Sequence, residues 1–326
     1  MSGADAVTTD SSEGGLLPAP GEFDADVAVI GAGPAGLSAA LNLVRARRRT
    51  LLVDSNRPRN AATLASHGFL TRDGVPPLEL RRLGREEFEA YEGATFHAAS
   101  VDAVEPIAGG FRLSGRGVRG AAPLGATARV LLIACGLVET LPALPSIRAW
   151  YGTQLHSCVE CDGYEKRDGA LALIGETDDL AERAVLVSQW SRDLIVFTNA
   201  IGTVTDEEER MLAARGIRVD RRAIADVEGE AGRMTGIRFA DGDFTPRSEG
   251  FVRPLWRPAL AAVQALGIET DADGLIVVDE RRRTSMPGVY AAGDTTPPGP
   301  EQLIVAAWEG AQAAAAINRD LLFGER

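Results

Sequence analysis

The chain of 326 residues has little of what defines several large classes of protein. Three cysteines are too few for the disulfide framework of a small secreted domain. No apolar run approaches the length of about 18 residues that a membrane span needs. Only 34 basic side chains stand against 46 acidic ones, and the net charge of −12 disfavours general binding to nucleic acid phosphates. We therefore expect no membrane span and no nucleic acid partner.

The rest of the composition is that of an ordinary globular protein, with 45% hydrophobic and 25% charged residues. The length predicts two domains, because a single hydrophobic core rarely serves more than about 250 residues. Residues 1–21 show neither the basic start nor the apolar core of a signal peptide. We therefore expect a disordered tail over 1–21 and a cytoplasmic protein.

A strand, a glycine-rich loop and a helix follow this tail. The β-branched run at residues 26–30 leads directly into the motif Gly31-Ala32-Gly33-Pro34-Ala35-Gly36. In such a motif the first glycine permits a tight turn, the second lets the backbone approach a pyrophosphate, and the third allows close packing of helix on strand. Asp54 ends the next strand, where a carboxylate can accept hydrogen bonds from a ribose. A plain glycine-rich turn is the alternative, but this context predicts a site for FAD or NAD.

The C-terminal part of the chain favours FAD. Residues 288–294 form a short apolar strand that ends in Gly293-Asp294. A carboxylate in this place can face a ribityl chain at a second helix start, whereas the alternative is a capped turn. Strands at 275–278 and 289–291 and a helix at 303–318 are expected to return the chain to the first domain.

One Cys-x-x-Cys motif indicates redox chemistry. Cys158 and Cys161 are within disulfide reach, and such a pair can carry two electrons. Half of a zinc site is the alternative, but Cys135 supplies no second pair, so we expect no metal. His156 is a candidate to take or return a thiol proton, although a lone histidine often has only a structural hydrogen bond.

A second strand–helix–strand unit over residues 171–197 lacks the features of a working nucleotide site. Its loop reads Gly175-Glu176-Thr177-Asp178-Asp179-Leu180, so only the first glycine is present. Carboxylates at a helix N-terminus repel a pyrophosphate, although an aspartate there can also be a simple cap. No basic residue follows the next strand until Arg210, so no partner for a 2′-phosphate is evident. Both features argue against use of NADPH.

Four motifs in this order resemble the low-molecular-weight thioredoxin reductase family of FAD disulfide oxidoreductases, over about residues 25–320. They are the first glycine motif, Leu-Leu-Ile-Ala-Cys-Gly at 131–136, the Cys-x-x-Cys-Asp-Gly motif and the segment 284–294. The resemblance implies an α/β fold of two Rossmann-like, three-layer ββα domains, the second inserted into the first. It implies a discontinuous FAD domain at 22–143 and 248–326, a degenerate NAD(P)-binding-like domain at 144–247 that carries the cysteine pair, and a homodimer.

The same resemblance implies roles for individual residues. Cys161 would be the thiol next to the flavin, Cys158 would exchange with substrate, and Asp162 would occupy the position of the general acid. The expected FAD contacts are Gly31, Gly33, Pro34, Ala35, Gly36, Asp54, Val101, Gly136, Gly293, Asp294, Gln302 and Leu303.

Two further segments, His-Gly-Phe-Leu-Thr-Arg-Asp-Gly at 67–74 and Gly-Tyr-Glu-Lys-Arg-Asp at 163–168, are similar to the gliotoxin and holomycin dithiol oxidase branch. Members of that branch close disulfides in small natural products and pass electrons from FAD to O2. This resemblance implies that His67 lies beside the flavin and Arg59 near the FAD phosphates; ordinary loop hydrogen bonds are the alternative. That branch usually has histidine after the second cysteine, whereas this chain has Asp162.

These features predict an FAD-dependent dithiol oxidase that oxidises a small-molecule dithiol, uses O2, produces H2O2 and does not use NADPH. One alternative is a thioredoxin-type disulfide reductase that acts on a thioredoxin-like protein and receives electrons from NADPH, ferredoxin or a deazaflavin. Another is a non-catalytic, redox-sensing flavoprotein.

Overall fold

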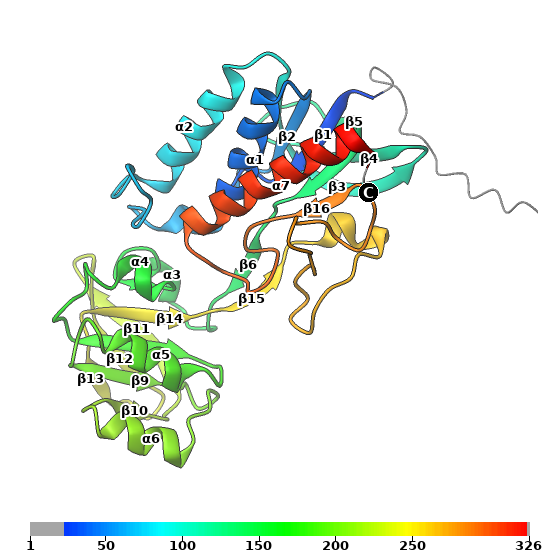
Figure 1. Cartoon of the computed structure of the whole chain (residues 1–326). Coiled ribbons are helices and arrows are strands. Elements are labelled where there is room, and N and C mark those ends of the chain that lie inside the picture. The colour runs from blue at the N-terminus through cyan, green and yellow to red at the C-terminus, as the bar shows by residue number, and fades with distance from the viewer. Residues whose placement is uncertain (1–22, 325–326) are drawn as a thin grey trace, which may run out of the picture.

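The computed structural model describes residues 23–324 and shows two α/β domains joined by two antiparallel strands (Figure 1). The predicted tail at residues 1–21 lies outside the described residues. No helix between residues 23 and 324 combines the length and the apolar character that a membrane crossing requires.

The first domain is built on a six-stranded sheet in which β1 lies between β2 and β5. All six residues of β1 are buried, as expected for a central strand of a parallel sheet with both faces covered. The long strands β3 and β5 continue beyond the parallel part and pair with β4 on an antiparallel extension. The strands are β1 Ala25–Ile30, β2 Thr50–Asp54, β3 Ala94–Ile107, β4 Gly110–Gly117, β5 Leu124–Ile133 and β16 Val289–Ala291.

Two hydrophobic cores cover the two faces of this sheet. One core packs α1 and α7 against the parallel part of the sheet. The other packs the antiparallel extension around β4, together with η2, against the opposite face, which gives three layers. The helices are α1 Pro34–Arg45, η1 Arg59–Ala62, α2 Pro77–Glu89, η2 Ala261–Leu266 and α7 Leu303–Phe323. The helix expected at 303–318 is therefore α7, and it continues to Phe323. The strand expected at 275–278 is wrong: Ile276 makes only an isolated bridge to Thr270.

The second domain has the same three layers around the sheet β10-β9-β8-β14-β7, with α5 and α6 on one face and the antiparallel sheet β11-β12-β13 on the other. The helices are α3 Ile147–Trp150, α4 Val159–Asp162, α5 Leu180–Val187 and α6 Asp206–Ala213. The strands are β7 Leu155–His156, β8 Leu171–Gly175, β9 Leu194–Phe197, β10 Arg218–Asp220, β11 Ile224–Glu230, β12 Arg233–Phe239, β13 Phe244–Pro246 and β14 Glu249–Arg253.

The link between the domains consists of β6 (Leu137–Thr140) and β15 (Leu255–Pro258), which pair in antiparallel register. The boundary predicted at 247/248 needs correction, because β14 pairs with β7 and β8 inside the second sheet. A boundary placed at the polar residues 247 and 248 misses this pairing, because β14 is the last element of the inserted domain and pairs with strands that come much earlier in the chain. The second domain thus extends to the end of β14.

Candidate functional site

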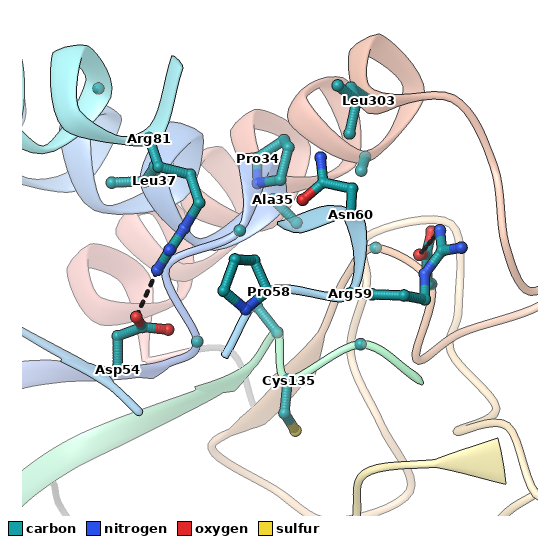
Figure 2. Close-up of a pocket in the computed structure, with 18 of the residues that line it drawn as sticks. Pro34, Ala35, Leu37, Asp54, Pro58, Arg59, Asn60, Arg81, Cys135 and Leu303 are labelled. Atoms are coloured by element: carbon teal, nitrogen blue, oxygen red, sulfur yellow. Dashed lines mark hydrogen bonds and ion pairs between the residues drawn. The ribbon is translucent and has the colours of Figure 1, made fainter. Parts of the chain in front are cut away.

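A cavity of about 630 Å³ lies at the carboxyl ends of the parallel strands of the first domain. In such folds this edge is where ligands bind. The cavity brings together most of the residues predicted to contact FAD, and Figure 2 shows Pro34, Ala35, Asp54 and Leu303 around it. The predicted residues in its wall are Gly31, Gly33, Pro34, Ala35, Asp54, Arg59, Val101, Gly136, Gly293, Asp294 and Leu303.

The three motif glycines differ in what a side chain would meet. A Cβ on Gly31, whose φ is +104°, would lie 2.3 Å from the carbonyl oxygen of Ala134. A Cβ on Gly36 would lie 1.8 Å from the carbonyl oxygen of Gly31, whereas one on Gly33 would meet nothing within 4 Å. Gly31 and Gly36 therefore serve the turn and the packing, and Gly33 leaves room at the start of α1, where backbone N–H groups attract a phosphate. This cradle fits a dinucleotide such as FAD.

Asp54 is held by groups of its own chain. Its Oδ1 accepts from the N–H of Ala32 at 3.0 Å, and its Oδ2 accepts from the N–H of Asn56 at 2.8 Å and from the guanidinium of Arg81 (Figure 2). A carboxylate has about four acceptor positions, so room remains for a ribose hydroxyl. Arg81, from α2, was not singled out in the sequence because no motif surrounds it.

A second cavity of about 440 Å³ contains the cysteine pair and adjoins the first. The two cavities share Arg59, Asn60, Glu301 and Leu303 in their walls. His67 and Gln302, which were expected beside the flavin, line this second cavity. Cys158, Cys161, His156 and Asp162 line it too, so the structure brings all four predicted catalytic residues together.

Cys158 and Cys161 form a disulfide with a Cα–Cα separation of 5.3 Å. Cys158 occupies the N-cap position of the short helix α4, and the N–H of Cys161 donates to its Sγ at 3.2 Å. Among residues 23–324 no group of histidines, cysteines and carboxylates has a geometry that could hold a metal ion. Burial raises the pKa of the third cysteine, Cys135, to about 12, which keeps its thiol protonated.

Burial also sets the charges next to the disulfide. It raises the pKa of Asp162 to about 6, against the opposing effect of the Lys166 ammonium. Burial and the same ammonium lower the pKa of His156 to about 3. Nε2 of His156 lies 3.4 Å from Oδ1 of Asp162. His156 is therefore neutral near neutral pH, and Asp162 is the partner that changes charge there.

Lys166 is the only lysine of the chain, and it is 3% exposed. Its Nζ lies 3.5 Å from Oε2 of Glu249, and burial lowers its pKa. In the sequence Lys166 stood only within the segment 163–168, and no role was predicted for it. Its single occurrence was the signal that could have identified it.

Arg59 lies between the two cavities. Its Nη2 is 2.8 Å from Oδ2 of Asp294, and its Nη1 is 3.1 Å from Oε1 of Glu139. Although burial opposes the charge, these carboxylates raise the pKa of Arg59. The side chain reaches the predicted FAD cavity, but its guanidinium is paired with carboxylates of the same chain.

Comparison with known proteins identifies the family. Residues 25–310 match the family model of pyridine nucleotide-disulphide oxidoreductases. The chain belongs to this family. The structure of a protein described as thioredoxin reductase TrxB from Bacillus anthracis is 36% identical, covers 93% of this chain and 100% of that chain, and has a TM-score of 0.85. The structure of HlmI is 38% identical, covers 91% of this chain and 92% of that chain, and has a TM-score of 0.84. Thioredoxin reductase sirT of Leptosphaeria maculans is 28% identical and covers 93% of this chain and 95% of sirT.

This member of the family is an FAD-dependent disulfide oxidoreductase of the thioredoxin reductase type, and the expected α/β fold with two nucleotide-binding domains is confirmed. Family membership also makes it an enzyme, so the alternative of a non-catalytic flavoprotein is wrong.

The second nucleotide-binding domain of this pyridine nucleotide-disulphide oxidoreductase has an unusual loop between β8 and α5. Glu176 accepts from Nδ2 of Asn199 at 2.7 Å, and Asp179 accepts from the side chains of Thr177, Arg183 and Arg253 at 2.6, 2.9 and 2.7 Å. Although burial opposes it, these three hydrogen bonds lower the pKa of Asp179.

The possible helix cap at this loop is not formed. Asp179 stands at the N-cap position of α5, but its side chain makes no capping hydrogen bond, because it is turned to the two arginines. Leu180 fills the space next to the remaining glycine: a Cβ on Gly175 would lie 2.5 Å from its Cδ2. The place where a second pyrophosphate would bind thus carries carboxylates and a buried leucine.

Proposed function

We propose that this enzyme is an FAD-dependent dithiol oxidase that closes a disulfide in a small molecule, with O2 as electron acceptor and without NADPH. The observation that carries the proposal is the β8–α5 loop, where Glu176 and Asp179 are fixed by hydrogen bonds at the start of α5. A dinucleotide phosphate placed there would meet the carboxylates of Glu176 and Asp179 where a phosphate-binding loop has glycines, and this negative charge opposes its binding at the N-terminus of α5. Electrons must then enter from the thiol side.

The second cavity supports a small dithiol as substrate. Its volume of about 440 Å³ lies within the range of about 300–1,000 Å³ that is usual for small-ligand sites. Leu186 and Trp256 give its wall apolar surface, and the disulfide lines the same space. A thioredoxin-like protein would need the disulfide on an open surface, whereas both cysteines are only partly exposed.

The residues of this chain support a balanced two-electron oxidation. A substrate thiolate attacks Sγ of Cys158, which breaks the disulfide and leaves Cys161 as a thiolate. Asp162 takes the proton of the second substrate thiol, which then attacks the mixed disulfide, closes the product disulfide and releases Cys158. The N–H of Cys161, 3.2 Å from Sγ of Cys158, stabilises the departing thiolate. His156 remains neutral and orients Asp162.

Residues in the wall of the first cavity, including Gly33, Asp54, Gly136, Asp294 and Leu303, would hold FAD. When bound, FAD supplies the acceptor that returns the cysteine pair to the disulfide and delivers the two electrons to O2, giving H2O2. The residue roles, the homodimer and the cytoplasmic location stay predictions.

The test compares two reductants in the absence of oxygen. Excess NADPH should leave the flavin absorbance unchanged, whereas dithiothreitol should bleach it. Admission of air should then restore the absorbance and yield one H2O2 for each disulfide formed. Cys158→Ser is the control, since it should abolish bleaching by the dithiol. Rapid bleaching by NADPH would refute the proposal, and bleaching by reduced ferredoxin or deazaflavin without dithiol-driven O2 uptake would favour the reductase.

A further inference from the structure

Two strands alone connect the domains covalently within residues 23–324. The chain enters the second domain through β6 and leaves it through β15. A link of this kind leaves the relative orientation of two domains to their non-covalent contacts. Because the disulfide belongs to the second domain and the FAD cavity to the first, these contacts decide whether the two meet.

The carboxylate of Glu139, in β6, gathers such contacts from both domains. Its Oε2 accepts from the hydroxyl of Tyr151 at 2.7 Å, and its Oε1 lies 3.1 Å from Nη1 of Arg59. Nε1 of Trp256 donates to Oε1 at 3.3 Å. The Glu139 side chain is 11% exposed, so these partners replace most of its water. We call this set the interdomain brace: Arg59, Glu139, Tyr151, Ser157, Trp256 and Asp294.

The brace reaches the two reacting parts of the site. On one side Arg59 joins Glu139 to Asp294, which lines the FAD cavity. On the other side Oγ of Ser157 lies 3.4 Å from Oε1 of Glu139 and 3.0 Å from the hydroxyl of Tyr151. Ser157 directly precedes Cys158 in the chain. One carboxylate therefore connects the wall of the FAD cavity with the residue beside the disulfide.

Next to the brace, the backbones of the two domains also approach each other closely. Gly152 of the second domain has φ +85°, and a Cβ on it would lie 2.1 Å from the carbonyl oxygen of Ala62 in η1. Only glycine permits both this conformation and this approach. The backbone of the second domain thus lies directly against the first, at the residue following Tyr151.

We propose that Glu139 is a positioning residue that, together with the close contact at Gly152, holds the Cys158–Cys161 disulfide beside the FAD cavity. Glu139 would thus act on the distance between the cysteine pair and the FAD cavity. It holds whichever way electrons flow, so it does not depend on the acceptor proposed above.

The first test compares Glu139→Gln with Glu228→Gln in the holoenzyme. Glu228 forms a half-exposed Glu–Arg pair with Arg238 that shares no residue with the brace, so it controls for the loss of one ion pair. Flavin reduction by dithiothreitol in a single anaerobic turnover should be roughly 10- to 100-fold slower in Glu139→Gln, since small misplacements of reacting groups have effects of this size. Glu228→Gln should remain within about twofold of the unmodified enzyme.

A second readout follows the domains directly. Spin labels at Glu92→Cys and Glu207→Cys, both exposed and one in each domain, report the interdomain distance, with excess unlabelled chain added to suppress signals between molecules. Glu139→Gln should broaden or shift this distance distribution, and Glu228→Gln should not. A residue with only a general stabilising role would lower the melting temperature without moving the distribution.

The pair Gly152→Ala and Gly216→Ala tests the backbone contact and remains informative if Glu139→Gln does not fold. Both glycines have positive φ, +85° and +78°, so both alanines carry similar backbone strain, but a Cβ on Gly216 meets nothing within 4 Å. Gly152→Ala should shift the distance distribution and slow flavin reduction, whereas Gly216→Ala should do neither. An unchanged distribution and rate in both Glu139→Gln and Gly152→Ala would overturn the proposal.

Discussion

Replacement of Asp162 by asparagine removes a buried carboxyl whose charge changes near neutral pH, since burial raises its pKa to about 6. With this pKa, about 9% of the carboxyl is ionised at pH 5 and about 91% at pH 7. If ionised Asp162 accepts the proton of the second thiol, the rate of flavin reduction divided by the thiolate fraction of the dithiol should rise about tenfold over this range and level off above pH 7. With an aspartate of the ordinary pKa of about 3.8, the rate divided by the thiolate fraction would be almost constant over the same interval.

Asp162→Asn should lose this tenfold rise. Its rate should follow the thiolate fraction of the substrate and rise up to about pH 8.5, and at pH 7 it should be slower by a factor of about 10² to 10⁴. The assay is the single-turnover loss of flavin absorbance with excess dithiothreitol between pH 5 and pH 9, without oxygen.

The matched control is His156→Asn. Because the pKa of His156 is lowered to about 3, this side chain is neutral over the whole range, and its replacement should leave the inflection near pH 6 in place. An inflection that persists in Asp162→Asn, or that disappears in His156→Asn instead, would refute the assignment of Asp162 as proton acceptor.

Three further outcomes follow from the geometry. Because the pKa of Asp162 is raised, the stability that its protonated form contributes is complete below pH 3.8 and is lost as pH rises through about 6. The free energy of unfolding of Asp162→Asn in urea should therefore exceed that of the unmodified protein by up to about 3 kcal/mol at pH 8, but not at pH 4. Gly33→Ala should leave thermal unfolding of the FAD-free protein unchanged and weaken FAD at least about tenfold in fluorescence titrations, because its Cβ enters only ligand space; Gly36→Ala should instead lower the melting temperature. Asp179→Ala should cost about 1–3 kcal/mol in urea unfolding, since it leaves two arginines without their carboxylate, and NADPH should still not bleach the flavin.

The parts of the site that sequence reasoning predicted have their chemistry in short, contiguous motifs. The geometry of each glycine of the first motif agrees with the task that its position predicts, with the turn at Gly31 and the open space at Gly33. The Cys-x-x-Cys motif is four residues long, so its two cysteines need only one turn of helix to form their disulfide. In these cases local spacing decides the geometry, so the sequence is sufficient.

The parts that were missed depend on residues far apart in the chain. Glu139 meets Arg59 across 80 positions, and Arg59 meets Asp294 across 235. Asp294 ends a motif, but no motif marks Glu139 or its pairing with Arg59. His67, which was expected next to the flavin, lines the cavity of the cysteine pair, where its Nε2 lies 3.7 Å from Oε1 of Glu165. Only the packing of the two domains creates these contacts.

The degenerate loop of the second domain shows how a local signal and a tertiary one combine. Its missing glycines predict a lost phosphate site, but the contacts that replace the phosphate cannot be read from spacing. Asp179 binds Arg253, whose guanidinium lies 4.0 Å from the ring of Trp256, and Trp256 in turn donates to Glu139. A phosphate at α5 would therefore have to displace a carboxylate from an arginine that is stacked against the interdomain link. Restoring the glycines alone would leave this competition in place, so the proposed loss of the nucleotide site involves the folded domain pair as well as the loop.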